Sequence, residues 1–420
     1  MTSMHLLAAL LTLPPGAPHW LGLLSLLLAV CALLGTLYAL VFAVVGIWTG
    51  RKALTSGQAE IPVGEKACTT NFLVCIPAHN EGSGLSATVA GVLTQNYPQA
   101  RIHCVVIADN CTDDTARFAA TAGAHVLVRN DPTRRGKGYA LAWAFAQSVN
   151  FPWDAACVID ADSVMEPDFF LAMDASMRRG YPVAQARYDF IQASDSRNWL
   201  QLFTAISKAA ENSFVYRARE RMGFLQLLQG NGICIARTAL EKVPWRAHSI
   251  VEDAEYALEV GKQGISVHYQ EAARIWSRQA TTVRDVQPQR VRWASGTWEL
   301  FRHGIPSLLK TAWTFKSLRP LEGIVMLLTT SRLLLIYLVG LSLVLGLAAA
   351  PPLSAFIWQM LTLVVGLQLI YMILMFRFAA DRPAPLAGLL RLPFYVVVVA
   401  SSQALAMVGV NRSVWWRTTR

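Results

Sequence analysis

The sequence predicts an α/β domain, built on a mainly parallel sheet, that lies between apolar segments long enough to span a membrane. Between residues 71 and 160, short apolar runs alternate with amphipathic stretches of about ten residues, which is typical of βαβ units. Each apolar run ends in polar residues, as a buried parallel strand does at its carboxyl end. The 420 residues are 54% hydrophobic and only 15% charged, which favours a membrane-anchored domain over a wholly soluble protein.

Four apolar stretches approach the roughly 20 residues that cross the hydrocarbon layer of a membrane. They cover residues 21–48, 333–350, 353–376 and 392–410. Basic residues follow the first stretch and precede the second, and by the positive-inside rule they place the central segment in the cytoplasm. These residues are Arg51, Lys52, Lys310, Lys316, Arg319 and Arg332. We therefore expect a protein integral to the cell (inner) membrane with a cytoplasmic catalytic domain, and a last stretch that is re-entrant or interfacial.

The same pattern divides the chain into six parts. They are an N-terminal membrane anchor (1–50), a linker (51–70), the α/β domain (71–300), interfacial helices (301–332), C-terminal membrane helices (333–410) and a basic tail (411–420).

The net charge of +10 could suggest a nucleic-acid partner, but the chain has no basic run of the kind that binds one. Anionic lipid headgroups and a phosphorylated substrate explain the excess charge more simply, so no nucleic acid is expected. The seven cysteines form no C-x-x-C pair, which argues against zinc and against disulfides.

Four predicted strands lead directly into polar residues that can carry chemistry. The strand over 71–77 ends at Pro77-Ala78 with Glu81 close behind, and the strand over 101–108 leads into Asp109. The strand over 125–128 is followed by the loop 129–138, in which Lys137 stands between two glycines. The fourth strand, over 155–159, leads into Asp160-Ala161-Asp162. Because the carboxyl ends of parallel strands meet at one edge, where open α/β sheets bind ligands, we expect these residues to lie together.

Asp160 and Asp162 are the candidate metal ligands. Carboxylates at positions i and i+2 of a strand that turns into a loop can converge on one hard cation, and Mg²⁺ commonly takes one or two carboxylates plus phosphate oxygens. The alternative is that the two aspartates cap the helix that begins near Pro167.

Further along the chain, three motifs complete a series. They are Gly230-Asn231-Gly232 after Gln229, the pair Glu252-Asp253 at the start of a predicted helix over 251–260, and Gln289-Arg290-Val291-Arg292-Trp293. In this order, with P-A-H-N-E, A-D-N-C-T-D-D-T, R-G-K-G and D-A-D before them, the motifs resemble those of membrane-embedded family 2 glycosyltransferases with a GT-A fold. The similarity is to polysaccharide synthases of the cellulose, chitin, hyaluronan and poly-N-acetylglucosamine type.

The resemblance implies a role for each motif. Asp253 would be the catalytic base and Glu252 would orient the site, while Asp160 and Asp162 would hold Mg²⁺ or Mn²⁺. The donor-binding residues would be Pro77, Ala78, Glu81, Asp109, Lys137, Asp160, Ala161, Asp162, Gln289, Arg290 and Arg292. The acceptor-binding residues would be Gln229, Gly230, Asn231, Gly232 and Trp293.

Structural alternatives stand beside these roles. Asp109 could cap a helix, although Thr112 and Asp113 could cap it equally well, and Lys137 could be a solvated loop residue. Glu252 and Asp253 could be favourable charges at a helix N-terminus, and both descriptions can hold together. The segment around Trp293 could be an amphipathic helix only.

The predicted function is inverting transfer of a sugar from a UDP-sugar to a growing glycan at the cytoplasmic face of the membrane. The alternatives are a single transfer to a lipid acceptor, nucleotidyl transfer, and a non-catalytic nucleotide-sugar sensor. The expected partners are the UDP-sugar donor, a glycan or lipid acceptor and the lipid bilayer, with a second copy of the chain or an export partner as a further candidate.

Overall fold

The computed structural model describes residues 19–56, 68–147, 151–191, 198–316, 319–330, 332–347, 349, 353–379 and 390–409. The predicted basic tail and the first 18 residues lie outside the described residues, as does most of the predicted linker.

Eight strands and a larger set of helices make up these residues. The strands are β1 Phe72–Ala78, β2 Ile102–Asp109, β3 His125–Arg129, β4 Ala155–Val158, β5 Ser163–Met165, β6 Val183–Phe190, β7 Ile233–Ala236 and β8 Val267–Ser277. The helices that flank the sheet are α3 Leu85–Leu93, α4 Thr115–Thr121, α5 Lys137–Ala146, α6 Phe169–Arg178, α9 Arg237–Lys242 and α10 Glu252–Lys262. The helix after β6 consists of α7 Trp199–Ala210, the π-helical turn η4 Glu211–Tyr216 and α8 Arg217–Met222. The remaining helices are α2 His19–Ser56, α11 Val283–Phe315, α12 Arg319–Thr330, α13 Arg332–Gly346, α14 Leu353–Leu374 with the π-helical turn η5 Met375–Ala379, and α15 Leu392–Met407.

The strands form one mixed sheet in the order β3-β2-β1-β4-β7-β6-β8-β5. The half that contains β1 to β4 is parallel, as predicted, while β7 runs antiparallel to both of its neighbours and β5 runs antiparallel to β8. Strands β2 and β3 are added on one side of β1 and β4 on the other, so the strand order reverses between β1 and β4, and the carboxyl ends of these two parallel strands form the crevice in which doubly wound sheets bind ligands.

Helices cover both faces of the sheet and bury two apolar cores. Along β1, Phe72 and Val74 point into one core, with α3 and α6, whereas Leu73 and Cys75 point into the other, with α5, α9 and α10. This alternation follows from the two-residue period of a strand, and burial on both faces explains why the strand sequences are apolar throughout.

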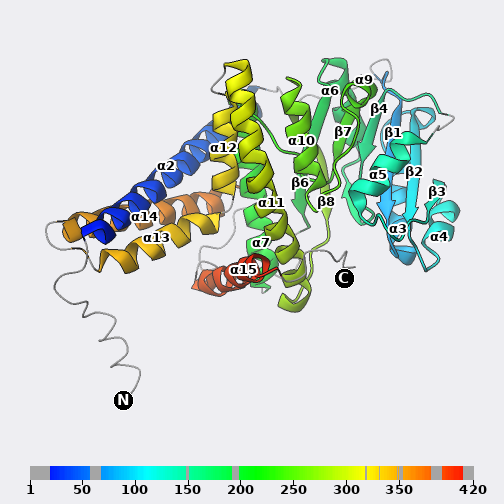
Figure 1. Ribbon diagram of the computed structural model, residues 1–420. Helices are drawn as coiled ribbons and strands as arrows, with labels where there is room; N and C mark the ends of the chain where they lie inside the picture. The colour runs from blue at the N-terminus through cyan, green and yellow to red at the C-terminus, as the bar shows by residue number, and fades with distance from the viewer. Residues whose placement is uncertain are drawn as a thin grey trace.

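The long apolar helices form a separate bundle that projects away from the sheet (Figure 1). In it α2 lies beside α13 and α14, and the Ser25 hydroxyl donates to the carbonyl of Ser342 at 2.6 Å. Among the described residues, two helices are long and apolar enough to cross a membrane, at His19–Gly50 and Leu353–Ala379. The two other predicted apolar stretches form shorter helices, since α13 has 15 residues and α15 has 16.

Helix α11 lies between this bundle and the sheet, and α15 packs on it (Figure 1). The Gln287 side chain donates to the Ser401 hydroxyl at 3.4 Å, and Arg290 donates to the Tyr395 hydroxyl at 2.9 Å. The part of α11 that carries the Gln289 to Trp293 motif is therefore in contact with the last apolar helix.

Candidate functional site

Asp109, at the end of β2, is buried at the carboxyl edge of the sheet. One carboxylate oxygen accepts a hydrogen bond from Arg129 at 2.5 Å and one from the Asn110 amide at 3.0 Å. The other oxygen, Oδ2, is buried and has no hydrogen-bond partner among the residues that the structure describes. A buried hydrogen-bond acceptor without a partner lowers the stability of the fold unless a ligand donates a hydrogen bond to it. This agrees with a role for Asp109 in binding the sugar donor.

The capping alternative for Asp109 is wrong, because another residue fills that role. Asp113 accepts hydrogen bonds from the backbone N–H of Thr115 at 3.0 Å and from its hydroxyl at 2.5 Å, at the start of α4. Beside it, the Asn80 side chain accepts from the backbone N–H of Thr112 at 2.8 Å and so joins the loops after β1 and β2. Pro77 and Ala78 are buried at the end of β1, and Glu81 follows, half-buried, in the same loop.

Lys137 is the first residue of α5 and points across the edge of the sheet. Its ammonium group donates to Asp160 Oδ1 at 2.5 Å and to the carbonyl of Gly230. It lies 4.0 Å from the Glu252 carboxylate, and its side chain is 17% exposed, so the alternative of a solvated loop lysine is wrong. Gly138 explains the close packing here, because a Cβ at this position would lie 2.3 Å from the carbonyl of Ala247.

The Asp160-Ala161-Asp162 segment links β4 to β5. The backbone N–H of Asp160 donates to the Asn231 side chain at 3.1 Å, and the Ala161 carbonyl accepts from the Thr88 hydroxyl at 2.9 Å. The carboxylate of Asp160 faces Lys137 and does not cap α6, which begins at Phe169.

The two carboxylates suit a hard divalent cation, because both supply oxygen ligands from one short loop. Within the described ranges, no group of three or more His, Cys, Asp or Glu side chains could hold a metal ion. A cation at Asp160 and Asp162 would therefore complete its coordination with substrate oxygens and water, as Mg²⁺ commonly does.

The loop from Gln229 to Gly232 lies against this segment, because β7 pairs with β4. The backbone N–H of Gly232 donates to the carbonyl of Val158 at 3.0 Å. The buried Asn231 side chain donates to the Ser163 hydroxyl at 2.9 Å and to the Ser277 hydroxyl at 3.2 Å. Gly230 has φ +77°, and a Cβ there would lie 3.1 Å from the Asp253 carboxylate, so the loop backbone closely approaches the candidate base.

Glu252 and Asp253 form the first turn of α10, so their placement at a helix N-terminus is compatible with a site role. Burial and the neighbouring Asp253 together raise the pKa of Glu252 to about 7, although Lys137 acts in the opposite direction. Burial also raises the pKa of Asp253. Asp160, together with Glu252 and Asp253, outweighs the effect of burial on Lys137 and keeps its pKa above the ordinary value.

The residues of the Gln289 to Trp293 motif face in different directions. Arg290 donates to the Thr204 hydroxyl at 2.8 Å and to Tyr395, which directs it toward α7 and α15. Gly296, one helical turn after Arg292, packs against Val251, so this face of α11 looks toward the carboxylate pair. Trp293 is 38% exposed and lines a small cavity with Gln289.

Sequence reasoning missed two residues of the site region. Arg129, the last residue of β3, is the partner of Asp109, and its place at a strand end was the signal that could have found it. Asn212 lies inside a helix, where no motif marks it, and its side chain accepts from Gln229 at 3.3 Å.

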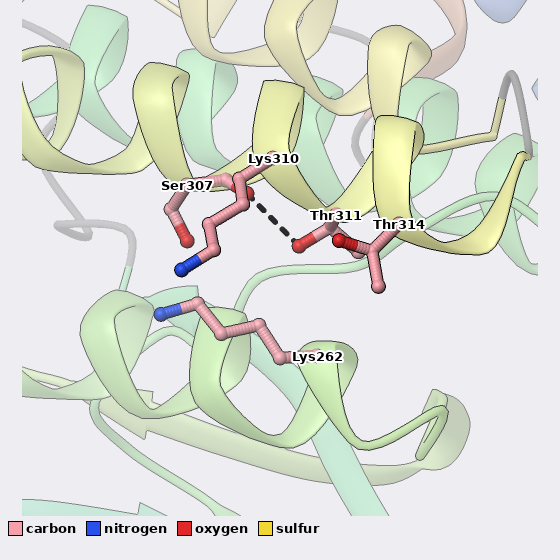
Figure 2. A pocket seen from close by; sticks show the side chains of 5 residues that line it. All are labelled: Lys262, Ser307, Lys310, Thr311 and Thr314. Atoms are coloured by element: carbon pink, nitrogen blue, oxygen red, sulfur yellow. Dashed lines mark hydrogen bonds between the residues drawn. The ribbon is translucent and has the colours of Figure 1, made fainter.

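A surface cavity of about 220 Å³ lies apart from these residues, between α10 and α11. Figure 2 shows the ammonium groups of Lys262 and Lys310 pointing toward each other across it. Hydroxyl side chains complete the lining, and Thr311 donates to the carbonyl of Ser307 at 2.9 Å. None of the predicted site residues lines this cavity, so the candidate active site is the edge of the sheet at Asp160 and Asp253.

The sequence is similar to a probable glycosyltransferase, YdaM, from Bacillus subtilis, with 27% identity over 232 residues, 53% of this chain and 54% of that protein. It is also similar to a poly-beta-1,6-N-acetyl-D-glucosamine synthase from Staphylococcus aureus, with 23% identity over 257 residues and 60% of each chain. The chain thus aligns with little more than half the length of these curated relatives.

Among solved structures, the mannosyltransferase PcManGT from Pyrobaculum calidifontis, in complex with GDP-Man and Mn²⁺, has a similar fold. The TM-score is 0.52 at 15% identity, over 90% of this chain and 99% of that one. The mixed sheet with its flanking helices is therefore a GT-A fold, as the motif series predicted. The family described as glycosyltransferase like family 2 matches residues 70–296, more than half of the sequence, and this protein therefore belongs to the family 2 glycosyltransferases.

Proposed function

We propose that this glycosyltransferase transfers a sugar, with inversion, from a UDP-sugar to a growing glycan at the cytoplasmic face of the membrane. The observation that carries the proposal is the group formed by Lys137, Asp160 and the pair Glu252 and Asp253. It brings together a cation that can bind a diphosphate, a carboxylate that can hold a metal ion, and a carboxylate that can act as a base.

In the proposed reaction, the hydroxyl oxygen of the acceptor bonds to the anomeric carbon of the donor, and Asp253 accepts the proton of that hydroxyl. The bond between that carbon and the diphosphate oxygen breaks, and the nucleoside diphosphate leaves. Lys137 and Arg292 stabilise the negative charge that develops on the diphosphate. Mg²⁺ or Mn²⁺, held by Asp160 and Asp162, would supply further electrostatic stabilisation of that leaving group.

Geometry supports the division of roles between the two carboxylates. Burial raises the pKa of both, so each can take up a proton, and Asp253 is the one that the Gly230 backbone approaches closely. The open Oδ2 of Asp109 would accept a hydrogen bond from the nucleoside, with Arg129 holding the carboxylate in place.

The relatives support the substrate classes. The name of the Staphylococcus aureus relative describes the synthesis of a polymer of N-acetylglucosamine, and the Pyrobaculum calidifontis structure holds a nucleoside-diphosphate sugar and Mn²⁺. Single transfer to a lipid acceptor is the second candidate. It is favoured because the described residues contain only two helices long enough to cross a membrane, which is few for a channel that passes a polymer.

A product assay tests the proposal. The full-length protein in nanodiscs is incubated with Mg²⁺ or Mn²⁺ and radiolabelled UDP-sugars, with GDP-mannose as a comparison donor, and the products are separated by size and by organic extraction. Label in a water-soluble polymer supports glycan extension, and label in one discrete organic-soluble species supports the lipid alternative.

The matched control is a pair of carboxylate-to-amide substitutions on α10. Asp253→Asn should abolish transfer while nucleotide binding is retained, whereas Glu259→Gln, on the exposed side of the same helix, should keep wild-type turnover. Near-normal turnover of Asp253→Asn would show that the base is assigned to the wrong residue.

A further inference from the structure

The helix that connects β6 to β7 contains a π-helical turn, η4, between α7 and α8. Such turns are rare and often occur at functional sites, because the extra residue displaces the side chains that follow it. In η4 the side chains of Asn212, Ser213, Phe214 and Tyr216 are all buried. The turn is therefore packed on more than one side, which raises the question of what it connects.

On one side, η4 holds the loop that approaches the candidate base. Asn212 is fully buried, and its Oδ1 accepts a hydrogen bond from the Gln229 side chain at 3.3 Å. Its amide nitrogen donates to the carbonyl of Tyr188 at 2.7 Å and to Asp189 Oδ1 at 2.9 Å, so its orientation is fixed by the end of β6.

A second buried amide extends this contact to the rest of the loop. Gln185 accepts from the backbone N–H of Gln229 at 2.9 Å and donates to the carbonyl of Asn231 at 2.8 Å. Between these two residues lies Gly230, whose carbonyl accepts the hydrogen bond from Lys137. The position of the loop thus helps to set the position of the Lys137 ammonium group.

On its other side, η4 is the seat of the N-terminal apolar helix α2. A Cβ on Gly46 would lie 2.3 Å from the carbonyl oxygen of Ser213 and 2.7 Å from the Cα of Phe214, so the two backbones are in direct contact. The end of α14 docks on the same turn, because the Ser213 hydroxyl donates to the carbonyl of Ala379 at 2.7 Å.

A polar network, buried at Arg187 and Asp189 and half-buried at Arg217 and Glu271, joins the two sides. Arg217 donates to the carbonyl of Gly46 at 3.1 Å and to Glu271 Oε2 at 2.8 Å, and Glu271 also pairs with Arg187 at 3.1 Å. Arg187 donates to Asp189 Oδ2 at 2.6 Å, and Asp189 is the carboxylate that Asn212 contacts. A fully bonded network of buried polar groups is rigid, since each broken bond leaves a costly unpaired group.

We propose that Asn212 is a positioning residue for the transfer reaction. In this proposal the contact of α2 with η4 at Gly46 fixes the position of the catalytic loop Gln229–Gly232. This inference rests on the proposed function, since it assigns Asn212 to the same site. Asn212 acts through Gln229 and does not touch substrate. The catalytic loop is then ordered only when the anchor helix α2 packs against η4.

The first test measures the loop itself and needs no turnover. Hydrogen exchange of the peptide that contains Gln229–Gly232 is followed in the full-length protein in nanodiscs. We expect faster exchange of this peptide in Asn212→Ala and in Gly46→Ala. The matched controls are Gln270→Ala, which removes a side chain that donates to the Ser176 hydroxyl at 2.9 Å behind α6, and Gly35→Ala, whose Cβ would meet only the flexible side chain of Leu335.

Unchanged exchange of this peptide in Asn212→Ala, or the same exchange in Gly46→Ala as in Gly35→Ala, would overturn the proposal. This outcome is distinct from a failure of the proposed function, which the product assay of the wild-type protein reports separately.

The second test measures turnover per nucleotide-binding site, counted by calorimetry so that misfolded molecules do not contribute. Asn212→Ala should lower kcat about tenfold and leave the donor KM within about twofold, because a misplaced loop affects the reaction geometry more than donor binding. Its effect should not multiply with that of Gln229→Ala, since both variants break one contact. Full multiplicativity, or an unchanged kcat per site, would show that Asn212 does not act through Gln229.

Discussion

Glu252→Gln tests the electrostatics of the site through stability. Burial raises the pKa of Glu252 to about 7 from an ordinary value of 4.5, so the folded protein keeps a proton that the unfolded chain releases between these two pH values. The unfolded state binds fewer protons in this window, and the free energy of unfolding of the wild type therefore falls as pH rises from 4.5 to about 7. Glutamine cannot ionise, so this dependence disappears in the variant.

The size of the effect follows from the two pKa values. One pKa unit corresponds to about 1.36 kcal/mol, so the ionised Glu252 lowers the free energy of unfolding by about 3 kcal/mol above pH 7, relative to the protonated form. For a catalytic domain of this size, 1 kcal/mol changes Tm by roughly 2–4 °C. Glu252→Gln should therefore gain on the order of 5–10 °C over the wild type between pH 5 and pH 8.

The assay is thermal unfolding in detergent with EDTA, from pH 4.5 to pH 8.5, so that no metal ion changes the charge near Lys137. Glu259→Gln, on the exposed side of α10, is the control and should follow the wild-type curve. Parallel curves of Tm against pH for Glu252→Gln and the wild type would refute the reasoning, because they would show that Glu252 ionises alike in the folded and unfolded chains.

Three further predictions concern the donor side of the site. Asp162→Ala should lose the part of nucleoside-diphosphate affinity that depends on Mg²⁺ or Mn²⁺. Calorimetry with and without EDTA measures this part. The prediction is contradicted if EDTA lowers the affinity of the variant as much as that of the wild type. Arg129→Met should lower the free energy of unfolding by about 3–5 kcal/mol, because it leaves Asp109 buried without its cation. Adding Asp109→Asn should restore stability but not affinity for the sugar donor. Denaturant titration measures both effects, and an unchanged unfolding midpoint in the single variant would contradict the prediction. Arg292→Met should raise the KM for the sugar donor about tenfold. Arg290→Met should instead increase hydrogen exchange in α15, because it removes the bond to Tyr395. Equal effects of both variants on KM would contradict the placement of the two arginines on different faces of α11.

The sequence was a good guide wherever a residue follows directly on a buried strand. Asp109 and Asp160 were placed correctly at one edge because parallel strands end on the same side, and this follows from the alternation of strands and helices alone. The contact of Lys137 with Asp160 joins a helix start to a strand end 23 residues away, and the motif series identified both residues but not their pairing.

Residues inside the helices were harder to predict, because their roles depend on packing between distant segments. Asn212 and Gly46 are unremarkable in the sequence, and they matter because η4 touches α2 on one side and Gln229 on the other. The π-helical turn that makes both contacts has no local sequence signal, since it differs from an α-helix only in the hydrogen bonds of one turn. The apolar stretches 333–350 and 392–410 extend past the ends of α13 and α15, so apolar composition alone does not give the ends of these helices.

The Gln289 to Trp293 motif shows why adjacent residues of one motif need not serve one ligand. Successive residues of an α-helix are rotated by about 100°, so Arg290 and Arg292 project about 200° apart and cannot both face the same site. Arg292 shares a face with Gly296, which contacts Val251 beside the carboxylate pair, and Arg290 bonds to Thr204 and Tyr395. Helix α11 lies between the site and the apolar bundle and contacts both. Arginines two residues apart place one side chain toward each of them within a single turn. The motif is therefore better described as two faces: one directed toward the carboxylate pair at the start of α10, and one that holds α15 and α7 against the catalytic domain.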